Sequence, residues 1–187
     1  MNVTLDGFHG TNLECVDSIL NDGFKPSSGN REWLGDGVYF FVEGLSKTPE
    51  NQATQWAIVS AWNNKKKAND YQEYAVLHGI ITVEEDKYLD LTEADGIDVL
   101  NYIQESCTAK LKTRNKKLHY IDGYLINYAR DTKLIDVEVV KGNFYIKLRK
   151  EDRQFDLSRR IANTTICSVY SQKHIQNVEV TTKGRVE

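Results

Sequence analysis

Proline and cysteine are scarce in this chain, which has two prolines and three cysteines among 187 residues. With so few prolines and no low-complexity tract, no linker is evident, and we expect a single domain over residues 1–187. Cys15, Cys107 and Cys167 lie far apart and form no Cys-x-x-Cys pair, so we expect reduced thiols in a cytoplasmic protein. No zinc-ligand spacing joins these cysteines to the histidines, and we expect no metal.

Long apolar runs and an excess of positive charge are also absent. No segment approaches the roughly 18 apolar residues of a membrane helix. The N-terminus, MNVTLDGFHG, lacks the basic and apolar regions of a signal peptide, so we expect no membrane partner. The formal net charge is −3 and the pI is about 5.9. These values argue against a strongly basic nucleic-acid binder, although a local basic patch is compatible with them.

Two glycine-containing segments near the N-terminus are the most informative features that are present. Phe8-His9-Gly10-Thr11 ends a strand-like run, and Gly35-Asp36-Gly37 leads into the apolar and aromatic run 38–41. Neither segment is a phosphate-binding loop, because GxxxxGK[ST] is absent and the second segment does not continue as GxGxxG. Glycine beside a polar or aromatic side chain lets a ligand approach the backbone closely. The two segments therefore suggest the walls of one small-molecule cleft.

The remaining pattern predicts an α+β domain, because the expected strands outnumber the helices and do not alternate regularly with them. Expected strands cover residues 3–9, 38–42, 74–83, 135–140, 144–148, 164–170 and 175–181. Expected helices cover residues 13–20, 49–62, 93–105 and 120–130.

Turn and capping signals separate these elements. We expect Gly23 to end the first helix, and Thr48-Pro49-Glu50 to begin the second with the Thr48 hydroxyl as its cap. Gly142-Asn143 predicts a hairpin between two strands. Loops are expected over residues 25–36, Lys110–Lys117 and Arg149–Arg160.

The two segments and the residues between them resemble the ADP-ribosyltransferase fold shared by diphtheria toxin and the poly(ADP-ribose) polymerases. In that family a first strand ends in His-Gly-Ser/Thr, a helix with Ile-Leu leads to Gly-Phe/Leu, and Gly-x-Gly-x-Tyr-Phe follows a loop. The matching residues here are His9-Gly10-Thr11, Ile19-Leu20, Gly23-Phe24, Gly35 to Phe40 and the helical segment Ala53 to Ala57. The resemblance implies a split antiparallel sheet at the core, with flanking helices.

The resemblance also implies a site for NAD as substrate, without a metal. His9 would hydrogen-bond ribose hydroxyls, Gly10 would offer its backbone to the nicotinamide carboxamide, and Thr11 would add a hydroxyl contact. Tyr39 would pack on the nicotinamide ring, with Trp56 on the other side of the ring. The family reaction breaks the nicotinamide–ribose bond, passes through an oxocarbenium-like sugar and transfers ADP-ribose to an acceptor, by positioning and electrostatics.

The third catalytic position departs from the common pattern of the family. Many members carry a glutamate about three residues before a Val-Tyr/Phe pair on a late strand. Alignment of Val169-Tyr170 with that pair puts Ile166 at the position, with Thr165 and Cys167 one residue away in register. None of the three is acidic, and mono-ADP-ribosyltransferase branches also show Ile, Leu or Thr there. The resemblance therefore favours transfer of a single ADP-ribose over chain elongation.

Glu73 is an alternative third residue, because Glu73-Tyr74 locally looks like the Glu-Tyr segment of the family. Its position directly after the helix that carries Trp56, however, fits the third strand of the family better than the late strand that carries the catalytic glutamate. Glu138 and Glu151 are weaker candidates.

The sequence thus predicts an NAD-dependent mono-ADP-ribosyltransferase that modifies a protein or a nucleic acid. A toxin or defence effector, with an antitoxin or immunity protein as partner, is one setting for such an enzyme. Lys65–Lys67, Lys110–Lys117 and Arg159-Arg160 would form a basic rim for a nucleic-acid acceptor. The alternatives are an inactive module that binds NAD or ADP-ribose, an NAD glycohydrolase and an RNA 2′-phosphotransferase.

Overall fold

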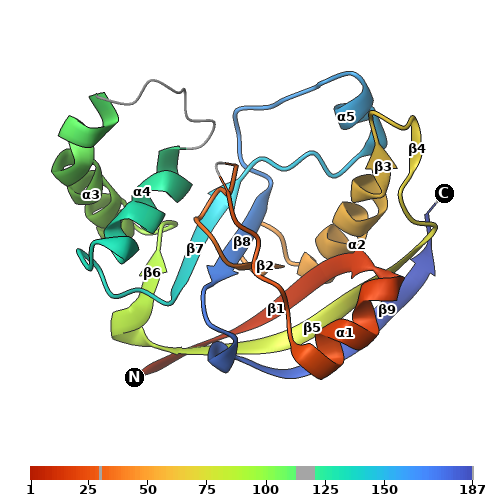
Figure 1. Ribbon diagram of the computed structural model, residues 1–187, viewed down its shortest axis with the longest axis horizontal. Coiled ribbons are helices and arrows are strands. Elements are labelled where there is room, and N and C mark those ends of the chain that lie inside the picture. The colour runs from red at the N-terminus through yellow and green to blue at the C-terminus, as the bar shows by residue number, and fades with distance from the viewer. Residues whose placement is uncertain (30, 113–120, 187) are drawn as a thin grey trace.

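The fold is built around one mixed, mostly antiparallel sheet, and the computed structural model describes residues 1–29, 31–112 and 121–186. Seven strands lie in the order β6-β7-β8-β2-β1-β5-β9, beside a small hairpin of two strands (Figure 1). The sheet consists of β1 (Asn2–Asn12), β2 (Val38–Phe41), β5 (Glu73–Glu84), β6 (Tyr88–Asp90), β7 (Val139–Phe144), β8 (Thr164–Val169) and β9 (Ile175–Arg185), and the hairpin of β3 (Trp62–Asn63) and β4 (Ala68–Asn69). The predicted α+β class is confirmed.

Five α-helices accompany the sheet in the described ranges. They are α1 (Val16–Asp22), α2 (Pro49–Ser60), α3 (Ala94–Lys112), α4 (Ile121–Asp131) and α5 (Lys150–Gln154). Short 3₁₀ turns cover Leu13–Cys15, Glu85–Lys87 and Gln172–His174.

The predicted helix boundaries are confirmed at two positions and wrong at a third. Gly23 ends α1, and its N–H donates to the Ile19 carbonyl at 2.9 Å. Pro49 begins α2, where its missing N–H costs nothing. Thr48, however, makes no capping hydrogen bond through its hydroxyl. Its own backbone N–H instead donates to the Ser46 hydroxyl at 3.1 Å.

The sheet is split between β1 and β2, as the family resemblance implies. β1 pairs with β5 along the whole of Asn2–Asn12. With β2 it shares the single register pair Phe8↔Phe41, whereas β2 pairs over its whole length with β8. We call the region where β1 and β2 continue past this pair, without a ladder between them, the seam.

Helices cover the half-sheet β1-β5-β9 on both faces (Figure 1). Alternate residues of a strand point to opposite faces. Val76 of β5 accordingly packs in one cluster with Ala53 and Ala57 of α2, whereas Leu77 belongs to the cluster around Val16 of α1. The burial of these apolar side chains holds α2 against the sheet next to the seam.

The predicted hairpin at Gly142-Asn143 is wrong. β7 runs straight through both residues and pairs with β8, so that Gly142 lies opposite Ile166 and Asn143 opposite Thr165. The Thr165 hydroxyl also donates to the side-chain oxygen of Asn143 at 2.7 Å. Pairing with a distant strand therefore overrides the local preference of Gly-Asn for a turn. Residues 135–138 and 145–148, which were expected in strands, lie outside β7.

The predicted loops around the basic segments are partly wrong. α3 continues to Lys112, so the first part of Lys110–Lys117 is helical, and residues 113–120 lie outside the described ranges. α5 occupies part of Arg149–Arg160. The sequence does not predict β6, which is parallel to β7, or the β3-β4 hairpin, because two or three residues carry no readable alternation.

Two general features of the described residues bear on function. None of their helices combines the length and the apolar character that a membrane span requires. They also contain no group of three or more His, Cys, Asp or Glu side chains arranged around a metal position. No disulfide joins the three cysteines, all of which lie in the described ranges, with Cys107 and Cys167 buried and Cys15 exposed.

Candidate functional site

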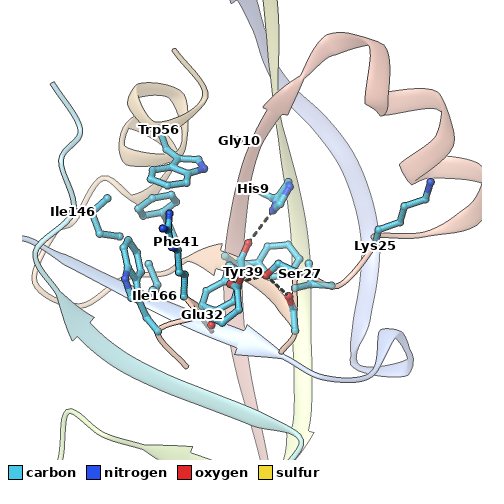
Figure 2. A pocket seen from close by; sticks show the side chains of 15 residues that line it. His9, Gly10, Lys25, Ser27, Glu32, Tyr39, Phe41, Trp56, Ile146 and Ile166 are labelled. Atoms are coloured by element: carbon cyan, nitrogen blue, oxygen red, sulfur yellow. Dashed lines mark hydrogen bonds between the residues drawn. The ribbon is translucent and has the colours of Figure 1, made fainter. Parts of the chain in front are cut away.

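A cleft of about 400 Å³ opens at the seam (Figure 2). Its walls come from β1, β2, the loop that precedes β2, helix α2 and strand β8. The cleft brings together five residues that the sequence nominated from distant segments: His9, Gly10, Tyr39, Trp56 and Ile166. The two glycine-containing segments therefore do form the walls of one cavity.

His9 joins the two strands across the seam. Its Nδ1 lies 2.8 Å from the Tyr39 carbonyl oxygen, and because that oxygen only accepts, Nδ1 carries the proton and donates (Figure 2). The ring also contacts Phe24 and Phe40 edge-on, with centroid separations of 5.1 and 5.8 Å. Burial lowers the pKa of His9, against the smaller opposing effect of its bond to the Tyr39 carbonyl. The imidazole is therefore neutral, and its Nε2 can accept a hydrogen bond.

Tyr39 uses its hydroxyl to hold the loop before β2. The hydroxyl donates to the Gly35 carbonyl at 2.7 Å and accepts from the Leu34 N–H at 2.8 Å. Burial is the largest cause of the raised pKa of Tyr39. The phenol therefore stays neutral and is committed to the loop, and its ring is the part that lines the cleft.

Further side chains hold the same loop in place. The Tyr170 hydroxyl donates to the Leu34 carbonyl at 2.6 Å. Asn127 of α4 accepts from the Asp36 N–H at 2.8 Å and donates to the Asp36 carboxylate at 3.0 Å. Gly35 has a φ of +80°, which glycine adopts without strain. The loop is thus anchored from β2, α4 and the end of β8.

Gly10 is needed for packing as well as for its place in the cleft. A Cβ at this position would lie 2.0 Å from the backbone carbonyl oxygen of Ala53 and 3.1 Å from the Ala57 Cβ. The missing side chain therefore lets α2 approach β1. This requirement comes from the fold and adds to the ligand contact that the resemblance implies for Gly10.

Trp56 brings an aromatic surface to the cleft from α2. Its ring lies 6.4 Å from the Trp33 ring and 6.5 Å from the Phe41 ring, centroid to centroid. The Arg153 guanidinium lies over the Trp56 ring at 5.0 Å and donates to the Val59 carbonyl at 2.9 Å. The indole is therefore packed from several sides while still lining the cleft (Figure 2).

Ile166, the residue at the third catalytic position, lies in the cleft lining. It is 2 % exposed and packs in the same apolar cluster as Phe41 and Ala53. Its neighbours Thr165 and Cys167 point to the other face of β8. Burial raises the pKa of the Cys167 thiol to about 12, so this cysteine is not a thiolate at neutral pH.

Among the described residues, those that line the cleft include neither Thr11 nor Glu73. Thr11 lies near the end of β1, opposite Ala75 of β5. Glu73 is exposed at the start of β5, and its carboxylate lies 3.7 Å from Nε of Arg185 on β9. The geometry thus brings five of the nominated residues together and leaves these two outside.

Charged residues of the loop before β2 also line the cleft, and sequence reasoning missed them. They are Lys25, Arg31 and Glu32. Glu32 is half-buried, and its carboxylate accepts a hydrogen bond from the Ser27 hydroxyl at 2.9 Å. A loop has no hydrophobic period, so only the presence of charges between the two glycine-containing segments could have indicated them.

The comparisons with known proteins name a relative but no activity. No family model matches the chain. The chain is 26% identical over 152 residues to "Uncharacterized protein MJ0359" of Methanocaldococcus jannaschii, in a match that covers 76% of this chain and 66% of that protein. The chain thus spans slightly less than two thirds of the length of this distant homologue.

Proposed function

We propose that this chain is an NAD-dependent mono-ADP-ribosyltransferase. The observation that carries the proposal is the convergence of His9, Gly10, Tyr39, Trp56 and Ile166 on one cleft at the split of the sheet. These residues come from four elements, and the family motifs nominate each of them independently of the coordinates.

The chemistry of the cleft suits a dinucleotide. The neutral His9 imidazole keeps a lone pair on Nε2, which can accept a hydrogen bond from a ribose hydroxyl. Lys25 and Arg31 supply positive charge for a diphosphate. In this proposal the rings of Tyr39 and Trp56 pack against nicotinamide, and the backbone of Gly10 binds its carboxamide.

Catalysis then rests on positioning rather than on a metal. Held by its ring and carboxamide, the nicotinamide leaves with the electron pair of its bond to ribose C1′, and an acceptor nucleophile attacks C1′. The apolar Ile166 offers no carboxylate to activate a further sugar hydroxyl, which fits a single transfer. The acceptor in this proposal is a protein or a nucleic acid, and a toxin or defence effector with a protein antidote is one setting for such an enzyme.

Nicotinamide release tests the proposal. The purified chain is incubated with NAD labelled in its adenylate phosphate, alone and with cell lysate, and nicotinamide and labelled macromolecules are measured. We expect release that depends on the cleft: Tyr39→Ala should abolish it, whereas Tyr102→Ala, an exposed position on α3, should retain it. A folded chain that releases no nicotinamide with any lysate would contradict the proposal.

A second candidate is a module that binds NAD or ADP-ribose without cleaving it, and Ile166 in place of a glutamate favours it. Calorimetric binding of NAD that is recovered unchanged would support this candidate. Free ADP-ribose as the main product, with or without lysate, would instead indicate an NAD glycohydrolase.

A further inference from the structure

The cleft contains a carboxylate, although not at the position where the family resemblance puts one. Ile166 occupies that position, and Glu73 lies outside the cleft. Among the described residues that line the cavity, Glu32 is the only acid. We propose that Glu32 supplies the catalytic carboxylate of this site, an inference that rests on the proposed function.

The surroundings of Glu32 leave its charge available. Within the described chain, no lysine or arginine forms an ion pair with it, and its hydrogen bond comes from the neutral Ser27 hydroxyl. Glu32 and Tyr39 lie near each other on the cleft wall (Figure 2). After burial and the opposing Leu34 N–H, the charge of Glu32 contributes to the raised pKa of the Tyr39 hydroxyl. The Glu32 carboxylate thus acts on Tyr39, a residue that it accompanies in the lining of the cleft.

The neighbouring acid of the same loop already has a structural task. The Asp36 carboxylate accepts from the Asn127 amide at 3.0 Å and from the Gly29 N–H at 3.2 Å, so it fixes the loop. The Glu32 carboxylate instead accepts its hydrogen bond from a side chain, the Ser27 hydroxyl. Of the two acidic side chains, that of Glu32 is therefore the one that can reorient towards a bound substrate.

The carboxylate has a defined part in the reaction. As the C1′–nitrogen bond breaks, its electron pair leaves with nicotinamide and positive charge develops on the ribose, which a carboxylate stabilises. The acceptor oxygen or nitrogen then forms the new bond to C1′. Its proton passes to the Glu32 carboxylate and from there to water, so the products are nicotinamide, the ADP-ribosylated acceptor and one proton.

Three variants test the role of Glu32 through nicotinamide release at saturating and limiting NAD. Glu32→Gln keeps the shape of the side chain and should lower kcat by about 10²-fold or more, with little change in KM. Glu32→Ala should show the same loss and regain at least about tenfold on addition of formate, which restores a carboxylate to the vacated space. Glu43→Gln, an exposed acid whose carboxylate pairs with Lys47, is the matched control and should keep the wild-type rate.

The outcomes separate this inference from the proposed function. If the wild type releases nicotinamide and Glu32→Gln keeps its kcat within about threefold, Glu32 is not the carboxylate and the enzyme proposal stands. If Glu32→Ala is folded but formate does not rescue it, and Ser27→Ala loses as much activity, the role of Glu32 is to hold the loop and the inference is wrong. If the wild type itself releases no nicotinamide, the proposed function fails and this inference fails with it.

Discussion

The two halves of the sheet hold their walls of the cleft in different ways. In one half, β1, β5 and β9 contain 11, 12 and 11 residues and pair over most of their length. In the other half, β2, β6, β7 and β8 contain only 4, 3, 6 and 6 residues. His9 and Gly10 thus belong to a strand that is paired with its neighbour over eleven residues, whereas Tyr39 belongs to a strand of four residues.

The short half depends on side chains to shape its wall. Tyr39, Tyr170 and Asn127 each bind the backbone of the loop before β2. The comparison teaches that backbone pairing sets the β1 wall, while a few side-chain hydrogen bonds set the β2 wall. Changes in the first wall should therefore act through packing, and changes in the second through individual polar contacts.

The largest effect is expected for Gly10→Ala in the long half. The new Cβ would lie 2.0 Å from the Ala53 carbonyl oxygen, so α2 must move away from β1. We expect a loss of about 3 kcal/mol or more in the free energy of unfolding, measured by urea titration.

Gly79→Ala on β5 is the control for this prediction. Its Cβ would meet the Cγ2 methyl of Ile175 at 3.3 Å and the Gln176 carbonyl oxygen at 3.7 Å, so we expect a change within about 1 kcal/mol. Equal losses for the two variants would mean that the approach of α2 to β1 is not what requires Gly10.

The next largest effect is expected for Tyr39→Phe in the short half. Without the hydroxyl, the Leu34 N–H and the Gly35 carbonyl both lose a partner in a largely buried place. We expect a loss of about 1–3 kcal/mol in the free energy of unfolding. Tyr102→Phe, at an exposed position on α3, should change it by less than about 0.5 kcal/mol. A Tyr39→Phe variant as stable as the wild type would show that these two bonds do not hold the wall.

The burial of His9 beside the seam should make stability depend on pH. Burial lowers the pKa of His9 in the folded chain, so the unfolded chain binds a proton first as the pH falls below about 6.5. The free energy of unfolding should be unaffected by His9 above that pH and should decrease below it, by at most about 1.4 kcal/mol per pH unit for one proton. Urea titrations of wild type and His9→Asn between about pH 8 and pH 5 isolate the contribution of His9 to this pH dependence. Parallel curves for the two proteins would contradict it.

The smallest effect is expected at the charged rim of the β2 wall. Lys25→Ala and Arg31→Ala should each raise the KM for NAD by about 2–5-fold and leave kcat unchanged, with a smaller difference at high salt. Lys47→Ala, on the exposed ion pair with Glu43, should leave KM unchanged. A change in kcat alone would mean that these cations act on the reaction rather than on binding.

Much of the fold could be predicted because its long elements carry a clear period. The strands around His9 and Val76 follow from alternation, and the start of α2 at Pro49 follows from the preference of proline for the first helical turn. Gly142-Asn143 shows where such reasoning fails, since a strong local turn signal yields to pairing with β8. The three residues of β6 are too few to show any period.

The candidate site could be predicted in part for a similar reason. His9, Gly10 and Tyr39 stand in motifs with fixed local spacing, and the structure brings them to one cleft. Glu32 lies in a loop whose path is set by partners far away in sequence, such as Asn127 and Tyr170. No local pattern of the sequence contains that information.

The most direct test of the central claim is a crystal structure of the chain with NAD, or with nicotinamide and ADP-ribose together. We predict the dinucleotide in the cleft at the seam, with a ribose hydroxyl on Nε2 of His9 and the nicotinamide ring between Tyr39 and Trp56. An empty seam in a crystal that binds NAD elsewhere would contradict the account.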